Sequence, residues 1–109
     1  VDKKAVEDAY LKTKNAAAEI IAKKGATYYA IALAVSRIVR AILYDEKHIF
    51  PVSVMLTGQY DLNDVCLSTP AVIGRTGIEK VLEINLSDDE LDKLRKSAKI
   101  IRDAIDLVR

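Results

Sequence analysis

The segment KKGATYYAIALAVSRIVRAILYDE, residues 23–46, carries the strongest structural signal in this chain. Two lysines followed by Gly25 are typical of a helix end, because cations favour the last turn and glycine tolerates the positive φ that follows it. Upstream, residues 3–24 repeat apolar side chains at three- and four-residue intervals, which predicts an amphipathic helix. From Thr27 to about Asp45 apolar residues occupy more than one face. We therefore expect a second helix that is buried on several sides, in a larger domain or a subunit interface.

The middle of the chain has the composition of β-strands. Pro51 marks the edge or the beginning of the first strand, because proline cannot donate to a strand ladder. Turn residues at positions 58–63 follow it, and Pro70 separates the two pieces of the next strand. The predicted strands comprise residues 49–56, residues 65–67 with 71–73, and residues 78–84. A sheet of three short antiparallel strands is the simplest arrangement.

The last segment predicts a third helix. Ser87 lies three residues before Glu90, which is the pattern of a capping box. An apolar stripe follows at alternating three- and four-residue spacing: Leu91, Leu94, Ala98, Ile101, Ile105 and Val108. This stripe is compatible with a coiled-coil seam, but three heptads are short for one, and a surface helix packed on a sheet is the preferred interpretation. The predicted fold class for residues 1–109 is therefore α+β, one domain with its helices on one face of a small antiparallel sheet.

Composition bounds the class of protein. The 109 residues have a formal net charge of +1, and their basic side chains are scattered. We expect no nucleic-acid partner and no membrane partner. The first ten residues carry five charges, which argues against a signal peptide, so an intracellular location is expected. The start at Val1, without an initiator methionine, is what we expect of a fragment or a processed product.

The residues alone assign no reaction. His48 is the only histidine, and a solvated loop histidine is the preferred interpretation over a general base. Cys66 is the only cysteine, so an intrachain disulfide is excluded, and its apolar surroundings predict a buried, inert thiol. One histidine and one cysteine do not make a metal site, and no glycine-rich phosphate loop is present.

A resemblance to a known family implies an activity that the residue patterns alone do not assign. In this order, the segments at 23–46, GQYD at 58–61 and DVCLSTPAVIGRTGIEKVLEI at 64–84 resemble the carboxyl-terminal half of the NAD-dependent lactate/malate dehydrogenase family, in particular its lactate dehydrogenase branch. The resemblance implies a part of an oxidoreductase that transfers a hydride between NADH and pyruvate. It implies a small 2-hydroxy or 2-oxo acid substrate, a cytoplasmic location, a role in glycolysis and a homotetramer or other homo-oligomer. The amino-terminal nucleotide-binding domain, which binds most of the NAD, is expected to be absent from this chain.

The resemblance also implies two site residues. Thr27 matches the position that lines the substrate pocket, and Ile31 matches the apolar residue that packs against the nicotinamide ring. The plainer interpretations are an N-capping threonine for Thr27 and a core residue for Ile31. No catalytic residue is transferred, because the family's histidine and arginines should lie upstream of Val1 and His48 does not match. The remainder of the enzyme is therefore an expected partner.

Two alternatives remain open. Ala18 stands where lactate dehydrogenases commonly carry tyrosine and is similar to the small residue of malate dehydrogenases, whereas Thr27 favours the lactate branch. A malate or other 2-hydroxy-acid dehydrogenase is therefore the first alternative. The second is a stand-alone binding or assembly domain of this fold that oligomerises through its apolar second helix.

Overall fold

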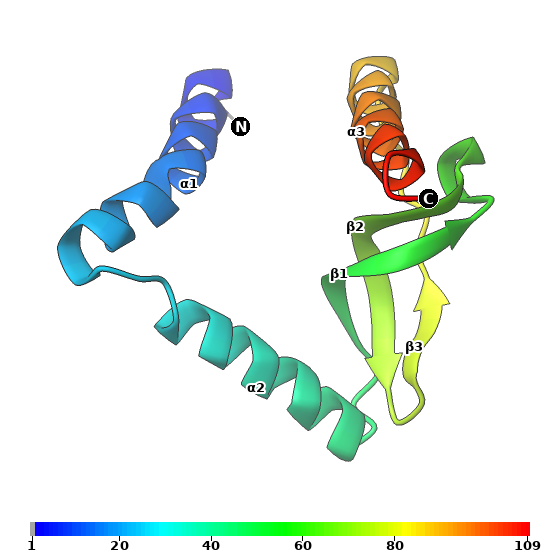
Figure 1. Ribbon diagram of the computed structural model, residues 1–109. Coiled ribbons are helices and arrows are strands. Elements are labelled where there is room, and N and C mark those ends of the chain that lie inside the picture. Colours follow the sequence, from blue (N-terminus) through cyan, green and yellow to red (C-terminus); the bar gives the residue numbers. More distant parts are fainter. Residues whose placement is uncertain (1) are drawn as a thin grey trace. The chain divides into compact units, whose positions relative to one another are not determined.

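A computed structural model describes residues 2–109 (Figure 1). The chain divides into two units, residues 1–37 and residues 38–109. The first unit contains helix α1 (Lys3–Lys24) and the beginning of helix α2 (Tyr29–Leu43). The second contains the end of α2, strands β1 (His48–Thr57), β2 (Asn63–Gly74) and β3 (Gly77–Val81), a short 3₁₀ turn η1 (Gln59–Asp61), and helix α3 (Asp88–Asp106).

Helix α1 has the bounds that the sequence predicts. The Asp2 side chain accepts a hydrogen bond from the Lys4 amide at 3.0 Å and caps the first turn. Gly25 has a φ of 81° and ends the helix in the left-handed region, where a side chain would be strained. No residue of α1 is buried, so its apolar stripe is open to a partner.

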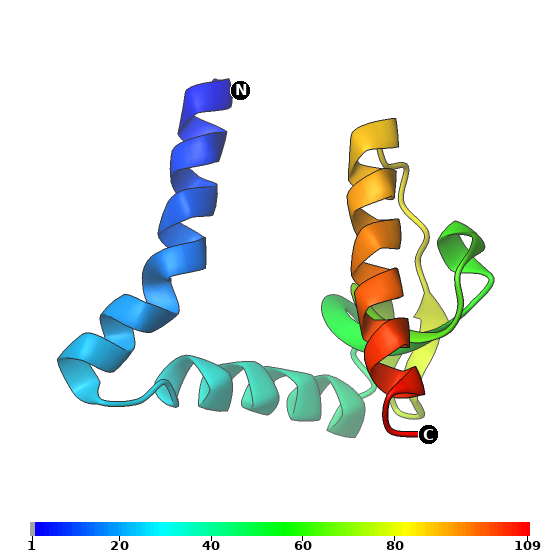
Figure 2. The same cartoon turned by 45° about the horizontal axis from the view of Figure 1, so that its top comes forward.

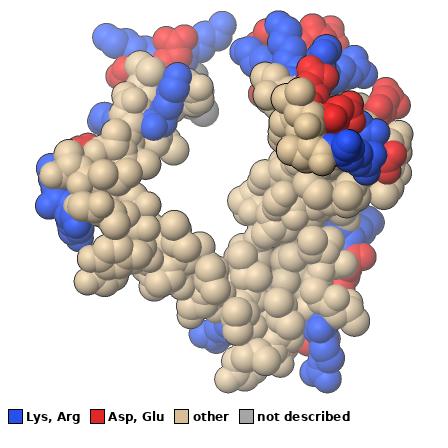
Figure 3. All heavy atoms as spheres, in the orientation of Figure 1, with Lys and Arg blue, Asp and Glu red and all other residues tan. Residues whose placement is uncertain are grey.

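Helix α2 is apolar but exposed. Of its residues only Ala41 is buried, in contrast to the burial on several sides that the sequence predicts. Six large apolar or aromatic side chains are exposed: Tyr29, Ile31, Leu33, Val35, Val39 and Leu43. Tan atoms without charge dominate this helix in the view of Figure 3. Within residues 2–109 these side chains stay exposed, and so much apolar surface on one helix is uncommon for a solvated face.

Taken singly, each helix of residues 2–109 is too short or too polar to cross a membrane. Helices α1 and α2 meet the length and composition criteria only as a pair, with a bend of 119° between them.

The sheet has the predicted three antiparallel strands in the order β1-β2-β3. The prediction that Pro70 interrupts the second strand is wrong, because β2 runs continuously through it. Pro51 lies directly opposite Pro70, and two residues without N–H groups can face each other only at a position where the strands exchange no hydrogen bonds. The Pro70 carbonyl instead accepts from the Leu82 amide at 2.8 Å. The third strand ends at Val81, three residues before the predicted end.

Helix α3 packs on one face of this sheet (Figure 2). Its capping box is confirmed, since the Ser87 and Glu90 side chains each accept a hydrogen bond from the other residue's amide. The core formed with the sheet consists of Val54, Leu56, Val65, Leu67, Ala71 and Ala98. Leu94 and Ile101 of α3 pack against this core, so the helix is a surface helix on a sheet. The predicted α+β fold class is confirmed.

The prediction of a buried thiol at Cys66 is wrong. Burial alternates along β2, with Val65 and Leu67 facing α3 and Cys66 exposed on the opposite face. Successive side chains of a strand point to opposite faces, so an apolar neighbourhood in sequence does not bury every member of it.

An ionic cluster joins the turn before β1 to the β2–β3 hairpin. Lys47 Nζ lies 2.8 Å from Glu79 Oε2 and 3.6 Å from Asp45 Oδ1, and the Arg75 amide donates to Asp45 Oδ1 at 2.9 Å. The Arg75 amide lowers the pKa of Asp45, and the Lys47 ammonium lowers the pKa of Glu79. The Glu79 carboxylate in turn raises the pKa of Lys47.

This cluster predicts a pH dependence of folding. A carboxylate with a lowered pKa stabilises the fold above its ordinary value, 3.8 for Asp45 and 4.5 for Glu79, and loses that effect as the pH falls through the folded-state pKa. We expect the urea midpoint to fall between about pH 5 and pH 2, and to fall less in the Lys47→Gln variant. Lys96→Gln is the control because Lys96 is an exposed cation outside the cluster. An equal acid response in both variants would contradict this role of Lys47.

Candidate functional site

The link between α1 and α2 places Thr27 at the surface of the first unit. The left-handed Gly25 turns the chain, and Ala26 and Thr27 follow without regular secondary structure. The Tyr28 carbonyl accepts the first hydrogen bond of α2, from the Ala32 amide at 2.9 Å. Helix α2 therefore begins at Tyr29, two residues after Thr27, which disfavours the N-cap interpretation of Thr27.

The hydroxyl group of half-buried Thr27 makes no hydrogen bond to any residue in the described range 2–109. Thr27 lines a cavity of about 170 Å³. The other walls come from Ile20 and Lys24 of α1 and from the neighbouring residues in the range 26–30. A threonine at such a wall offers a methyl group, which limits the size of a bound group, and a hydroxyl that can donate or accept a hydrogen bond.

Two aromatic rings and one cation make contacts beside the Thr27 cavity. The ring centroids of Tyr28 and Tyr29 are 4.6 Å apart and tilted by 45°. The Lys24 ammonium lies 5.1 Å from the centre of the Tyr29 ring, a cation–π distance. These contacts connect the last turn of α1 to the first turn of α2, and they hold the link that carries Thr27.

Ile31 lies one helical turn after Thr27 and is 58% exposed. It is not among the residues that line the Thr27 cavity, so the structure does not bring the two predicted site residues into one pocket. The core interpretation of Ile31 does not hold within this chain. An exposed aliphatic side chain can cover the face of a flat ring such as nicotinamide, so Ile31 fits that part of the implied NAD.

The remaining candidate, His48, begins strand β1. Its Nε2 atom lies 3.7 Å from Glu46 Oε2, its ring stacks on Phe50 at 6.0 Å, and half of its side chain is exposed. The exposed environment is as predicted, but His48 is the first residue of a strand and not a loop residue.

Tyr60 is a buried residue that the sequence does not single out. Its φ of 56° is unusual for a bulky residue. Its amide donates to Glu83 Oε1 at 3.1 Å, and its hydroxyl accepts from the Ile84 amide at 3.0 Å. These bonds fasten the β1–β2 turn to the segment that leads into α3. The only sequence signal is the glycine-led turn GQYD.

Comparison with known proteins gives consistent results. The family described as lactate/malate dehydrogenase, alpha/beta C-terminal domain, matches residues 1–109. L-lactate dehydrogenase of Acetivibrio thermocellus is 53% identical over 96 residues, which is 88% of this chain and 30% of that enzyme. L-lactate dehydrogenase of Thermoanaerobacterium saccharolyticum is 54% identical over 91 residues, 84% of this chain and 29% of that enzyme. The chain thus spans about a third of the length of these relatives.

Solved structures share the fold. Minor L-lactate dehydrogenase from Enterococcus mundtii matches with a TM-score of 0.93 and 32% identity, over all of this chain and 35% of that one. Malate dehydrogenase from Aeropyrum pernix matches with a TM-score of 0.89 and 34% identity, over 97% of this chain and 36% of that one. The chain therefore belongs to the lactate/malate dehydrogenase family and corresponds to the family's carboxyl-terminal domain.

Proposed function

We propose that this chain is the carboxyl-terminal portion of a cytoplasmic, NAD-dependent L-lactate dehydrogenase that reduces pyruvate in glycolysis. The observation that carries the proposal is the 53% identity with the L-lactate dehydrogenase of Acetivibrio thermocellus over 88% of this chain. The link at residues 25–28 supports it, because it presents an unpartnered threonine hydroxyl beside a small cavity. Activity requires the rest of the enzyme.

In this proposal Thr27 and Ile31 shape the site and do no chemistry. NAD, when bound, supplies or accepts the hydride. The Thr27 side chain limits the size of the group on the 2-oxo acid, and the exposed Ile31 side chain keeps water away from one face of the nicotinamide. The sequence has no glycine-rich phosphate loop, so in this proposal the amino-terminal half binds the phosphates of the cofactor.

Replacing Thr27 by glycine in the complete enzyme tests the pocket role. The change removes the whole threonine side chain, Cβ with its methyl and hydroxyl groups. It should shift preference toward bulkier 2-oxo acids by about 10–200-fold, the value of one or two methyl-sized groups in a pocket. The measurement is the ratio of kcat/KM for pyruvate to kcat/KM for 2-oxoisocaproate. Tyr44→Ala is the control, since Tyr44 is exposed and remote in sequence. An unchanged ratio would remove Thr27 from the pocket.

Helix α2 supports a second part of the proposal, a subunit interface. The helix exposes more apolar side-chain surface than a small monomeric domain normally leaves in contact with water. Exposed apolar surfaces of this kind usually mark protein–protein interfaces. We expect the chain to form a homodimer or homotetramer, alone or with the rest of the enzyme. Sedimentation at low micromolar concentration measures this. A well-folded monomer of 12.0 kDa with cooperative unfolding would contradict it.

A malate dehydrogenase is the second candidate. The Aeropyrum pernix and Salinibacter ruber malate dehydrogenases match with TM-scores of 0.89 and 0.91, close to the lactate dehydrogenase structures, and Ala18 fits that branch. Comparison of kcat/KM for pyruvate and oxaloacetate in the complete enzyme separates the two.

A further inference from the structure

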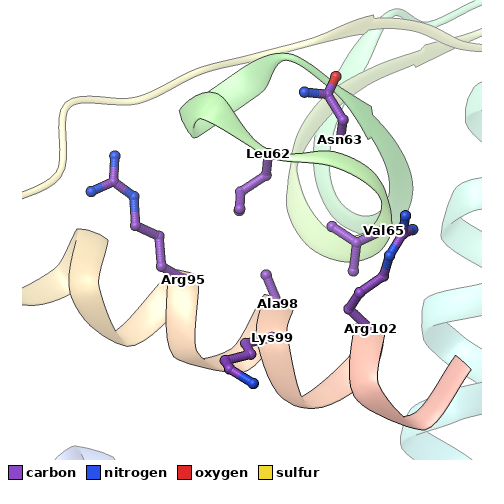
Figure 4. A pocket seen from close by; sticks show the side chains of 7 residues that line it. All are labelled: Leu62, Asn63, Val65, Arg95, Ala98, Lys99 and Arg102. Atoms are coloured by element: carbon purple, nitrogen blue, oxygen red, sulfur yellow. The ribbon is translucent and has the colours of Figure 1, made fainter. Parts of the chain in front are cut away.

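A second cavity, of about 240 Å³, lies between α3 and the beginning of β2 (Figure 4). Its floor is apolar. Val65 and Ala98 are buried core residues, and half-buried Leu62 packs against the same core. The volume is below the range of about 300–1,000 Å³ that is usual for drug-sized ligands, so only a small molecule fits.

Three cations lie along this cavity on one side of α3. Arg95, Lys99 and Arg102 are spaced by four and then three residues, which places them on one helical face. Arg102 is seven positions after Arg95, which places the two about 10 Å apart along the helix axis. In Figure 4 these two arginines stand at opposite ends of the cavity, with Ala98 between them.

The two arginines are weakly compensated. Arg95 Nη2 lies 3.4 Å from Asp61 Oδ2, and the Asp61 side chain is 91% exposed, which makes this a loose surface pair. Arg102 Nη1 donates at 2.6 Å to the Asp64 carbonyl, a neutral acceptor, and within residues 2–109 it has no carboxylate partner. Lys99 differs from both, because it is held by Asp103 at 2.8 Å.

We propose that this cavity binds a small aliphatic dicarboxylate, with one carboxylate at Arg95, the other at Arg102, and the methylene chain on the apolar floor. The forked guanidinium group matches the two oxygens of a carboxylate. At Arg95, one ligand carboxylate replaces the exposed Asp61 side chain at little cost in free energy. At Arg102, the other ligand carboxylate supplies the negative charge that the neutral Asp64 carbonyl lacks.

The floor distinguishes this ligand from inorganic anions. Leu62, Val65 and Ala98 have no side-chain donors, so sulfate or phosphate oxygens that lie over them would be unsatisfied, and the amide of Asn63 is the one neutral side-chain donor in the lining. A methylene chain has no such requirement. Because the two arginines leave the helix about 10 Å apart along its axis, a chain of about six carbon atoms is favoured over shorter acids.

The test uses the complete protein that carries this chain, titrated calorimetrically with adipate. We expect one adipate per chain, and weaker binding of succinate and of the monocarboxylate hexanoate. Arg95→Ala and Arg102→Ala should each weaken adipate binding at least tenfold, which is about 1.4 kcal/mol. Arg102→Lys should fall between wild type and Arg102→Ala, because it keeps the charge but loses the fork.

Two controls locate the binding. Lys96→Ala removes a cation from an exposed position of α3 that does not line the cavity, and it should leave adipate binding unchanged. Thr27→Gly should also leave it unchanged, which separates this cavity from the proposed substrate pocket. If Arg102→Ala fails to fold by circular dichroism, Arg95→Ala decides, since that side chain is 45% exposed.

Three results would overturn the proposal. Equal affinity for adipate and hexanoate would show that the second arginine makes no contact. Unchanged binding in both arginine variants would place the ligand elsewhere, and binding of sulfate or phosphate in preference to adipate would show that the apolar floor has no role.

Discussion

The 109-residue chain on its own should show no measurable reduction of pyruvate by NADH. It contains the proposed wall of the pocket, but the proton-donating histidine and the substrate-binding arginines of the family are expected upstream. A general acid contributes about 10²–10⁴-fold and a single oriented donor about 10²–10³-fold, so their combined loss takes turnover below detection. The measurement is the decrease of NADH absorbance with purified chain and saturating pyruvate.

Adding the separately produced amino-terminal half is the positive control for this assay, since it should restore turnover if the two parts assemble. Turnover by the chain alone that survives repurification would contradict the prediction. It would require a catalytic role for His48, which His48→Gln would then test.

Replacing Leu56 by alanine should destabilise the fold by about 2–5 kcal/mol, the usual cost of truncating a fully buried leucine. Leu56 is 1% exposed and lies in the core between the sheet and α3. A loss of this size is a large part of the stability of a small domain, so the urea midpoint should fall steeply or the fold should be lost.

Met55→Ala is the matched control for Leu56→Ala. Met55 is the preceding residue of β1, points to the opposite face and is 54% exposed, so its truncation in the isolated chain should change the stability by less than about 0.5 kcal/mol. Equal losses in the two variants would show that β1 does not present the observed face to α3.

Local signals predicted the elements that depend on local interactions. Helix α1 ends at Gly25 and α3 begins after Ser87, both as predicted, because caps act within a few residues. Pro70 misled the prediction. Its nitrogen is directed away from β1, where it faces Pro51, and on the other side the Leu82 carbonyl accepts a hydrogen bond from the Thr69 hydroxyl at 3.3 Å in place of a Pro70 N–H. Register is a property of two strands, and one strand's sequence does not contain it.

The alternation along β2 could have corrected the prediction for Cys66. Val65, Leu67, Thr69 and Ala71 share the buried face, and Cys66 is out of phase with them. Burial of α2 was overestimated for another reason: its apolar faces predict burial, but among residues 2–109 only Ala41 of that helix is buried.

The candidate site was predictable only through family resemblance. Neither the residue types nor the spacing of Thr27 and Ile31 indicates a pocket. In the structure a small cavity is lined by Thr27 and not by Ile31. The row Arg95, Lys99 and Arg102 did carry a sequence signal, a basic stripe at helical spacing beside the small residue Ala98. The cation row indicates a binding site only together with the apolar floor, and the β1–β2 turn and the beginning of β2 place that floor beside α3.

Strand β1 lies at the edge of the sheet, and the pairing of Pro51 with Pro70 affects how that edge meets other chains. At such a pair the backbone of each residue is directed away from its partner strand, so the Pro51 nitrogen faces the outer edge. An incoming strand would find no donor there and would meet the pyrrolidine ring instead. Edge prolines of this kind hinder strand-by-strand growth. The domain can therefore expose a sheet edge during synthesis and assembly with less risk of aggregation.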